Sequence, residues 1–482
     1  MWYNRDMKKE YGINNKPNLN LARKRLGKET KVIDFEIAQK YQNIGIGKTY
    51  MIKTYGCQGN LSDSGKMAGI IETLGFKRVD EEINADFILF NTCAIRENAE
   101  NRIFGELGRI KKIKKQHPEL IIGICGCMMQ EEATIEKIQK KYPHVDVIFG
   151  THNIVKLPEY LYIALNNQKA LEVMSIEGDI YENIPNVRDH PYKAWVDIMY
   201  GCDEFCTYCI VPYTRGKERS RRPEDIIKEV QSLAEAGYQE VTLLGQNVDA
   251  YGKDLNIDYT FANLLTDLNK INIPRIRFTT SHPRDFDETT IEAMALGGNI
   301  MPHLHLPVQS GNDEVLKRMN RKYTSSEYIK KMNKLKERVP GISITTDIIV
   351  AFPGETEEQF EDTLKLVEAI EFECAFTFIY SPRIGTPAAK YPNPLTEEEK
   401  KKRLLTLNKK INEYTLKGHK RFEGEIVEVL VDGFSKTDDE MLTGYTKHNK
   451  LVNFKGSEDL IGKIVQVKVK KSFTWHLLGE LI

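Results

Sequence analysis

The stretch Gly201-Cys202-Asp203-Glu204-Phe205-Cys206-Thr207-Tyr208-Cys209 is the feature around which the rest of the chain is organised. It places three thiols in the spacing Cys-x-x-x-Cys-x-x-Cys, directly after a predicted strand at 195–199. A structural zinc site needs four ligands, whereas an iron–sulfur cubane held by three thiolates keeps one iron open for a substrate. We therefore predict such a cluster. A zinc knuckle or redox thiol group is the alternative, but no nearby His or Cys completes a zinc set.

From residue 195 onward, predicted strands alternate with predicted helices, which indicates a parallel α/β sheet. The strands are expected at 195–199, 240–244, 275–280, 303–308, 343–350 and 375–380. Six such units are two fewer than a closed eightfold barrel contains. We therefore predict an open partial barrel over 188–417, with its chemistry at the carboxyl ends of the strands.

A second alternating series covers 48–166, with strands expected at 49–55, 86–91, 120–125 and 145–149. Cys57, Cys93 and Cys127 each follow the carboxyl end of one of these strands. In open parallel sheets this edge is where ligands bind. The three thiols should therefore converge, and a second three-thiolate cluster is the physical interpretation. Three unrelated free cysteines remain the alternative, because buried cysteine is common.

The remaining segments are simpler. Residues 1–47 are polar, and we expect a flexible arm with one short helix near 31–41. Residues 167–187 are expected to be a connector. From 418 to 482, period-two alternation between glycines predicts a small β-barrel of the OB type. Its possible RNA contacts, against the alternative of a structural cap, are Lys447, Lys450, Lys468, Lys470 and Lys471 for phosphates and Phe454, Phe473 and Trp475 for stacking.

Composition excludes several classes of protein. Basic and acidic residues number 69 each, so no global field attracts polyanions and any nucleic-acid site must be a local patch. Eight cysteines in 482 residues are too few for a disulfide scaffold and suit metal ligation in a reducing cytoplasm. No apolar run reaches the length of a membrane span, and residues 1–9 lack the apolar core of a signal peptide.

The cysteine motifs resemble those of a known family. The stretch 201–209 resembles the radical S-adenosylmethionine (SAM) signature, and 55–60, 91–96 and 125–130 resemble the three amino-terminal motifs of the methylthiotransferases. The resemblance implies a SAM-bound [4Fe-4S] cluster on Cys202, Cys206 and Cys209. It also implies an auxiliary [4Fe-4S] cluster on Cys57, Cys93 and Cys127, with Cys125 outside the set as a buried strand residue. Gly59 replaces a usual Met, and Ala351 a usual Gly.

Further residues follow from the same resemblance. Tyr208 is expected near the adenine of SAM, and the carboxyl-terminal domain resembles the RNA-associated TRAM domain. We favour the basic run 215–222 for contact with substrate phosphate or the SAM carboxylate, and amide side chains for both ends of the SAM amino acid. The predicted cofactor-binding residues are Tyr208, Gly245, Gln246, Asn247, Ser281, Gln309, Asp347, Phe352 and Arg383.

The resemblance implies a radical reaction on tRNA. One SAM methylates a sulfur of the auxiliary cluster, and a second is cleaved to a 5′-deoxyadenosyl radical that takes hydrogen from C2 of an adenosine. The chain looks closest to members that act on N6-isopentenyladenosine at position 37, in the anticodon loop. Other members modify N6-threonylcarbamoyladenosine or a ribosomal-protein aspartate, and a non-catalytic iron–sulfur RNA-binding protein is the alternative from another class. We expect a cytoplasmic monomer served by an electron donor such as flavodoxin or ferredoxin and by a sulfur or cluster donor.

Overall fold

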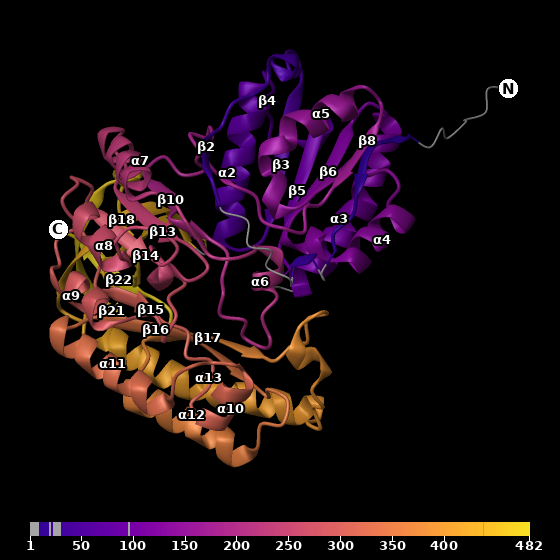
Figure 1. The fold of residues 1–482 in the computed structure, drawn as a ribbon. Coiled ribbons are helices and arrows are strands. Elements are labelled where there is room, and N and C mark those ends of the chain that lie inside the picture. The colour runs from indigo at the N-terminus through magenta and orange to yellow at the C-terminus, as the bar shows by residue number, and fades with distance from the viewer. Residues whose placement is uncertain (1–8, 19–20, 23–29, 95–96, 437) are drawn as a thin grey trace. The chain divides into compact units, whose positions relative to one another are not determined.

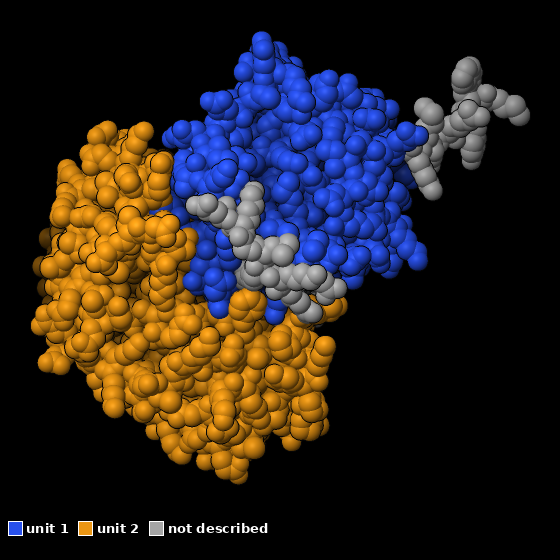
Figure 2. Space-filling model, in the orientation of Figure 1, with its two compact units in different colours: residues 1–189, 200–203, 210–221 blue, residues 190–199, 204–209, 222–482 orange. Residues whose placement is uncertain are grey.

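The computed structural model describes residues 9–18, 21–22, 30–94, 97–436 and 438–482. Ile95 and Arg96 of the second cysteine motif therefore lie outside the described residues, as does the start of the expected arm. The chain forms two compact units, coloured separately in Figure 2. The first comprises residues 1–189, 200–203 and 210–221, and the second comprises 190–199, 204–209 and 222–482.

The first unit is built on a seven-stranded parallel sheet with the order β1-β8-β7-β6-β5-β3-β4 (Figure 1). Its inner strands β5 and β6 are buried along their whole length, as expected for a parallel sheet covered on both faces. The strands are β1 (Tyr11–Asn15), β3 (Thr49–Tyr55), β4 (Lys77–Arg78), β5 (Phe87–Thr92), β6 (Ile121–Gly126), β7 (Val147–Phe149) and β8 (Lys169–Glu172).

Helices cover both faces of this sheet and bury a separate apolar core on each. The helices α2 (Gln58–Thr73) and α5 (Leu157–Leu165) pack on one face. The helices α3 (Glu97–Gln116) and α4 (Glu132–Lys141) pack on the other. The segment 210–221 of the same unit holds the short helix α6 (Val211–Thr214) and the strand β12 (Arg219–Ser220).

Two expectations for the polar segments differ from the structure. Within the expected arm, Tyr11–Asn15 is the edge strand β1, paired with β8 of the expected connector. In place of a helix near 31–41, β2 (Val32–Asp34) pairs with β9 (Ile180–Glu182), and Gln39–Tyr41 is a single 3-10 turn. These short strands gain their hydrogen bonds from residues far away in sequence, which a local pattern does not reveal.

The second unit contains six parallel strands in two three-stranded sheets, β10-β13-β14 and β15-β16-β17. An isolated parallel bridge pairs Ile276, near the start of β14, with Ile300, which lies just before β15. The expected partial barrel is thereby confirmed. The strands are β10 (Lys193–Asp197), β13 (Glu240–Leu244), β14 (Arg275–Phe278), β15 (His303–His305), β16 (Ser343–Val350) and β17 (Cys374–Ile379).

Amphipathic helices follow the strands and pack on the outer face in one large core. Four of them begin with a capping box, and α7 begins with Pro at the first position and two acids, so each start is encoded locally. They are α7 (Pro223–Glu235), α8 (Phe261–Leu268), α9 (Glu288–Ala295), α10 (Asp313–Arg318), α11 (Ser325–Arg338), α12 (Glu357–Ile370) and α13 (Glu397–Lys420).

The carboxyl-terminal segment closes into the expected small barrel, which has five strands in the order β18-β19-β20-β22-β21. The sequence pattern missed β22, which is only half-buried and lacks clean alternation. Two predicted RNA contacts are wrong: Phe454 is fully buried in the barrel core, and buried Lys450 pairs with Glu373 at 2.7 Å. The strands are β18 (Ile426–Ser435), β19 (Asp438–Thr446), β20 (Leu451–Lys455), β21 (Ile464–Ser472) and β22 (Leu477–Leu481).

Across the described ranges, none of the helices is long and apolar enough to cross a membrane.

Candidate active site

Three cysteines of the first unit follow three neighbouring strands. Cys57 caps the start of α2 after β3, Cys93 follows β5 directly, and Cys127 begins a 3-10 turn after β6. The strand ends are in register, because Tyr55 pairs with Thr92 and Thr92 pairs with Gly126. The register therefore brings the three cysteines to one edge of the sheet, as the sequence predicted.

A network of amides holds this edge together. Asn60 accepts a hydrogen bond from the backbone N–H of Cys57 (3.2 Å) and donates to Asn91 Oδ1 (3.1 Å). In return, Asn91 donates to the backbone oxygen of Asn60 (2.8 Å) and to Ser64 Oγ (3.0 Å). Both amides are fully buried. Buried polar groups that are satisfied in this way fix a single arrangement, so the loops carrying Cys57 and Cys93 are held in place.

The electrostatics of this edge favour the thiolate of Cys57. A hydrogen bond from Cys93 and the nearby Arg215 guanidinium lower the pKa of Cys57 to about 5, against the opposing effect of burial. Burial raises the pKa of Cys127, although Arg215 acts in the opposite direction. Arg215 approaches Cys127 directly, with 3.3 Å between Nε and Sγ. Thiolates are the ligands of iron–sulfur clusters, so the three side chains fit such a group.

Cys125 is separate from this set. It lies on β6 in the core beneath α2, and its thiol contacts Met67 Sδ at 3.6 Å. Between it and Cys127, Gly126 has φ of 102°. A Cβ at Gly126 would lie 2.2 Å from the backbone oxygen of Thr92, so only glycine fits the turn that directs Cys127 out of the strand. The placement agrees with the prediction that Cys125 is a buried strand residue.

The motif 201–209 is divided between the two units, and each part is held by its own contacts. In the first unit, the backbone N–H of Cys202 donates to the oxygen of Gly216 (3.1 Å). Gly201 has φ of 78°, and a Cβ there would lie 1.9 Å from the oxygen of Lys217. The cysteine loop and the segment that follows it are therefore closely packed backbone to backbone.

In the second unit, the loop between α10 and α11 supports the other part of the motif. Asn320 donates to the backbone oxygens of Glu204 (3.2 Å) and Phe205 (3.0 Å), and Phe205 has a left-handed φ of 48°. Buried Arg321 donates to Cys206 Sγ (3.4 Å) and to the oxygen of Pro307 (2.8 Å). Sequence reasoning missed this role, because a charged residue has no sequence period that reveals its partner.

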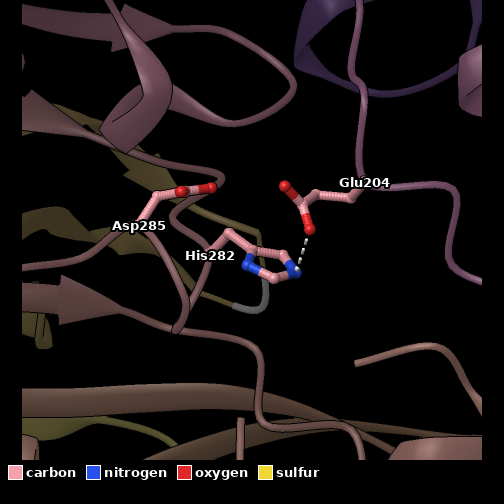
Figure 3. Close-up of side chains that lie close together, drawn as sticks. All are labelled: Glu204, His282 and Asp285. Carbon is pink, nitrogen blue, oxygen red and sulfur yellow. Dashed lines mark ion pairs between the residues drawn. The ribbon is translucent and has the colours of Figure 1, made fainter. Parts of the chain in front are cut away.

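A buried charged cluster lies beside the motif, formed by Glu204, His282 and Asp285 (Figure 3). His282 Nε2 is 3.7 Å from Glu204 Oε2. Arg284 pairs with both Glu204 and Asp285, and Lys253 also pairs with Asp285. These cations already neutralise the carboxylates, so we interpret the cluster as a brace for the motif rather than a metal site.

Most of the predicted cofactor-binding residues lie at or near the carboxyl ends of the strands, and several are held by polar contacts. Asn247 donates to Asp285 (2.7 Å), Ser281 bonds Asp249 (3.4 Å), and Gln309, at φ of 69°, bridges to β16. Gly245 and Gln246 follow β13, Asp347 lies in the middle of β16, and Arg383 follows β17.

Phe352 differs from these residues, because its side chain is fully buried among aromatic rings. It packs edge-on against Tyr208 at 6.5 Å and against Tyr380 at 5.3 Å. Protein atoms enclose this ring completely, so the predicted contact of Phe352 with the cofactor stays a prediction. Its ring supports Tyr208, the residue that precedes Cys209.

The basic run 215–222 was favoured for contact with phosphate or carboxylate of a ligand, but its arginines are engaged within the protein. Arg215 pairs with Asp63 (2.7 Å) and Arg221 with Glu182 (2.6 Å), and both are buried. Arg219 donates to the backbone oxygen of Gly178 (2.7 Å) and Arg222 pairs with Asp225 (2.6 Å). A charge pattern alone does not distinguish a ligand site from internal ion pairs.

Three family descriptions match consecutive parts of the chain. Residues 49–150 match the Uncharacterized protein family UPF0004, residues 196–367 match the Radical SAM superfamily, and residues 420–482 match the TRAM domain. Among solved structures, a radical S-adenosylmethionine methyltransferase, TsrM, from Kitasatospora setae superposes with a TM-score of 0.52 at 12% identity, covering 71% of this chain and 77% of that one. This likeness supports the fold.

Full-length relatives are much closer in sequence. Three proteins described as tRNA-2-methylthio-N(6)-dimethylallyladenosine synthase are similar along almost their whole length. The Bacillus subtilis protein is 56% identical over 97% of this chain and 92% of its own. The Halalkalibacterium halodurans protein is 54% identical (98% and 89%), and the Staphylococcus epidermidis protein is 56% identical (97% and 91%). The chain therefore belongs to the radical SAM methylthiotransferase family, among the tRNA-2-methylthio-N(6)-dimethylallyladenosine synthases.

Proposed function

We propose that this chain adds a methylthio group to C2 of N6-dimethylallyladenosine in tRNA, at position 37 beside the anticodon. The observation that carries the proposal is the presence of two complete three-cysteine sets in a chain 56% identical to such a synthase. The test is mass spectrometry of tRNA nucleosides from cells that lack this protein. They should accumulate dimethylallyladenosine and lose its 2-methylthio derivative, and re-expression should restore it. Loss of a methylthio group from threonylcarbamoyladenosine instead would assign the chain to the other tRNA activity.

Membership of the family implies SAM and one [4Fe-4S] cluster, which Cys202, Cys206 and Cys209 would hold. When bound, this cluster supplies the electron for reductive cleavage of SAM. The reaction needs the resulting radical, because no acid–base side chain activates an aromatic C–H bond. We further propose that Cys57, Cys93 and Cys127 hold a second [4Fe-4S] cluster. Its support is the register of β3, β5 and β6 and the lowered pKa of Cys57.

The chain's own residues have supporting roles in this proposal. Arg321 donates a hydrogen bond to the Cys206 sulfur, and Asn320 holds the backbone between Cys202 and Cys206. Tyr208 packs edge to face against the buried ring of Phe352 and remains the predicted neighbour of the adenine of SAM. The polar residues after the strands, among them Asn247, remain the predicted contacts for the amino acid part of SAM.

We place the substrate base at the inner face of β15, β16 and β17. The outer face of these strands is buried against the helices through Ile344, Ile348 and Val350. On the opposite face, Phe376 and Phe378 are 58% and 51% exposed, an unusual exposure for phenylalanine on a barrel strand.

Polar groups adjoin these rings. Phe376 pairs with Asp347 across the strands, and His305 packs edge-on against Phe376 at 5.9 Å while its Nε2 lies 3.3 Å from Asp347. Two aromatic rings beside a carboxylate suit a purine that carries an apolar N6 substituent and an N6–H donor. A charged N6 substituent, as in threonylcarbamoyladenosine, would be a poor fit to the same rings. The arrangement therefore favours the dimethylallyl substrate over the threonylcarbamoyl one.

The carboxyl-terminal barrel is the proposed tRNA-binding domain. Lys468 and Lys471 are exposed, Trp475 is 63% exposed, and Lys471 lies 5.0 Å from the centroid of Phe473. A mixture of cations and exposed rings is typical of surfaces that follow a single-stranded backbone and stack its bases. Lys447 and Lys470 are weaker candidates, because they pair with Glu428 (3.1 Å) and Glu480 (2.6 Å).

A non-catalytic iron–sulfur RNA-binding protein remains the alternative. It needs no open iron, so reduced and reconstituted protein would not release 5′-deoxyadenosine from SAM. With tRNA as its substrate, we expect the enzyme to work in the cytoplasm as a monomer, with a flavodoxin or ferredoxin as electron donor and a separate protein that restores the consumed sulfur.

A further inference from the structure

Arg215 is a buried cation at the second cysteine set whose role the reaction does not explain. It follows α6 shortly after Cys209, and the segment 210–221 carries it into the first unit. Its side chain is only 9% exposed. Since an arginine stays charged in proteins, this position holds a fixed positive charge.

Two hydrogen bonds define the orientation of its guanidinium. Nε donates to Cys127 Sγ at 3.3 Å, and Nη2 donates to Asp63 Oδ2 at 2.7 Å. Asp63 is itself buried, on α2. Burying an ion pair costs desolvation, and apolar residues of the same volume are often as stable or more so. A buried arginine aimed at a ligand sulfur therefore points to a role in charge balance.

The surroundings of Arg215 support this interpretation. A Cβ added at Gly59 would lie 3.6 Å from Arg215 Nη2 and 3.7 Å from Cys57 Sγ. The absence of a side chain at position 59 thus leaves the guanidinium and the Cys57 thiol facing the same space. Arg215 and Asp63 also line a cavity of about 80 Å³, whereas none of the three cysteines does. The ion pair therefore stands between the sulfurs and this cavity.

We propose that Arg215 is a positioning residue for the second cluster, where its hydrogen bond to Cys127 and its charge raise the reduction potential. The inference rests on the proposed second cluster. A cubane with three thiolates is a net anion, and reduction adds a further negative charge. Hydrogen bonds to the sulfurs and nearby charge are the known determinants of cluster potential. A fixed cation favours the reduced form, and Asp63 holds it in place.

The test compares Arg215→Gln with Arg215→Lys in the full chain, reconstituted anaerobically. The readouts are iron content and a redox titration followed by electron paramagnetic resonance. A parallel set in which Cys202, Cys206 and Cys209 are replaced by Ala assigns the second cluster's signal. We expect Arg215→Gln to keep its iron and shift this potential to more negative values. Arg215→Lys should shift it less, because it keeps the charge and loses the geometry of the Nε–H donor.

Arg221→Gln is the matched control, because Arg221 is a buried arginine of the same segment that pairs with Glu182 through Nε and Nη2 (2.7 and 2.6 Å). It should leave the potential within error of the wild type. An unchanged potential and spectrum in Arg215→Gln, at full iron content, would overturn the proposal. If Arg215→Gln does not fold, an unchanged potential in both Arg215→Lys and Asp63→Asn overturns it instead. Wild-type protein with only one cluster would refute the proposed function itself.

Discussion

Arg275 joins the carboxyl-terminal barrel to the partial barrel, and its replacement by Met should loosen that junction. Its side chain is fully buried at the start of β14. Nη1 donates to the backbone oxygen of Tyr445 (2.8 Å), and Nη2 donates to the backbone oxygen (3.2 Å) and the carboxylate (3.0 Å) of Glu428. Met keeps most of the buried apolar length and removes all three bonds.

The expected cost follows from these contacts. Hydrogen bonds to a charged group contribute about 1.5–3 kcal/mol each, and removing one member of a buried pair costs about 3–5 kcal/mol. The apolar surface of Met offsets part of the summed loss, so we expect Arg275→Met to destabilise the junction by about 3–5 kcal/mol. At about 1.4 kcal/mol per factor of ten, local opening of β18 and β19 should become at least roughly 100-fold more frequent.

Native-state hydrogen exchange on the full chain measures this opening directly, and the remaining strands serve as an internal reference. Lys447→Met is the matched control, because Lys447 also pairs with Glu428 (3.1 Å) but its side chain is 43% exposed. A surface ion pair contributes about 0–1 kcal/mol, so the control should change protection less than tenfold. Equal protection of β18 and β19 in the two variants would refute the reasoning. Arg275→Lys keeps the charge but loses the planar guanidinium that donates several hydrogen bonds. Its protection of β18 and β19 should lie between those of the other two variants.

Cys125→Ala should retain the iron of the reconstituted chain, about eight per chain for two cubanes, and nearly full activity; loss of a whole cluster would show that Cys125 is the ligand. Phe376→Ala should weaken binding of dimethylallyladenosine tRNA at least tenfold while SAM cleavage without tRNA persists, and equal KM values would remove Phe376 from the substrate site. Trp475→Ala should weaken tRNA binding without flattening its salt dependence, because stacking releases no counterions; unchanged affinity would favour a structural cap. Burial raises the pKa of Asp249 to about 7 from 3.8, so the protonated carboxyl stabilises the fold below about pH 4 and this contribution is lost as the pH rises to 7. Asp249→Asn should therefore flatten the pH dependence of stability in that window, and an unaltered slope would show that Asp249 is ionised throughout.

The contacts of the carboxyl-terminal barrel determine what a truncation near residue 420 would test. From the sequence alone, such a chain should keep both clusters and lose only tRNA affinity. The structure shows that Arg275, Arg277 and Glu373 would lose partners in the removed barrel. Truncation would therefore expose buried charges and test folding together with binding. Point variants on the exposed face of the barrel separate the two effects.

Local chemistry determined much of this protein in advance. Each cysteine that follows a buried strand had to lie at the carboxyl edge of its sheet, because parallel strands end there together. The repeated strand and helix patterns, with capping residues such as Thr324, Thr356 and Thr396, specified the partial barrel. Period-two alternation likewise specified the small barrel. These features depend on neighbours a few residues apart, so sequence reasoning could recover them.

Only the tertiary structure decided the partners of the charged side chains. Three buried arginines look alike in the sequence but have different partners. Arg215 contacts Cys127, Arg321 contacts Cys206, and Arg275 joins two domains. Lys450 was expected to face RNA and instead pairs with Glu373. Polar contacts join residues up to 240 positions apart, as between Tyr192 and Asp432. Whether a cation meets solvent, a sulfur or a carboxylate depends on how separate strands pack. A charge has no sequence period that reveals its partner, whereas an apolar face does.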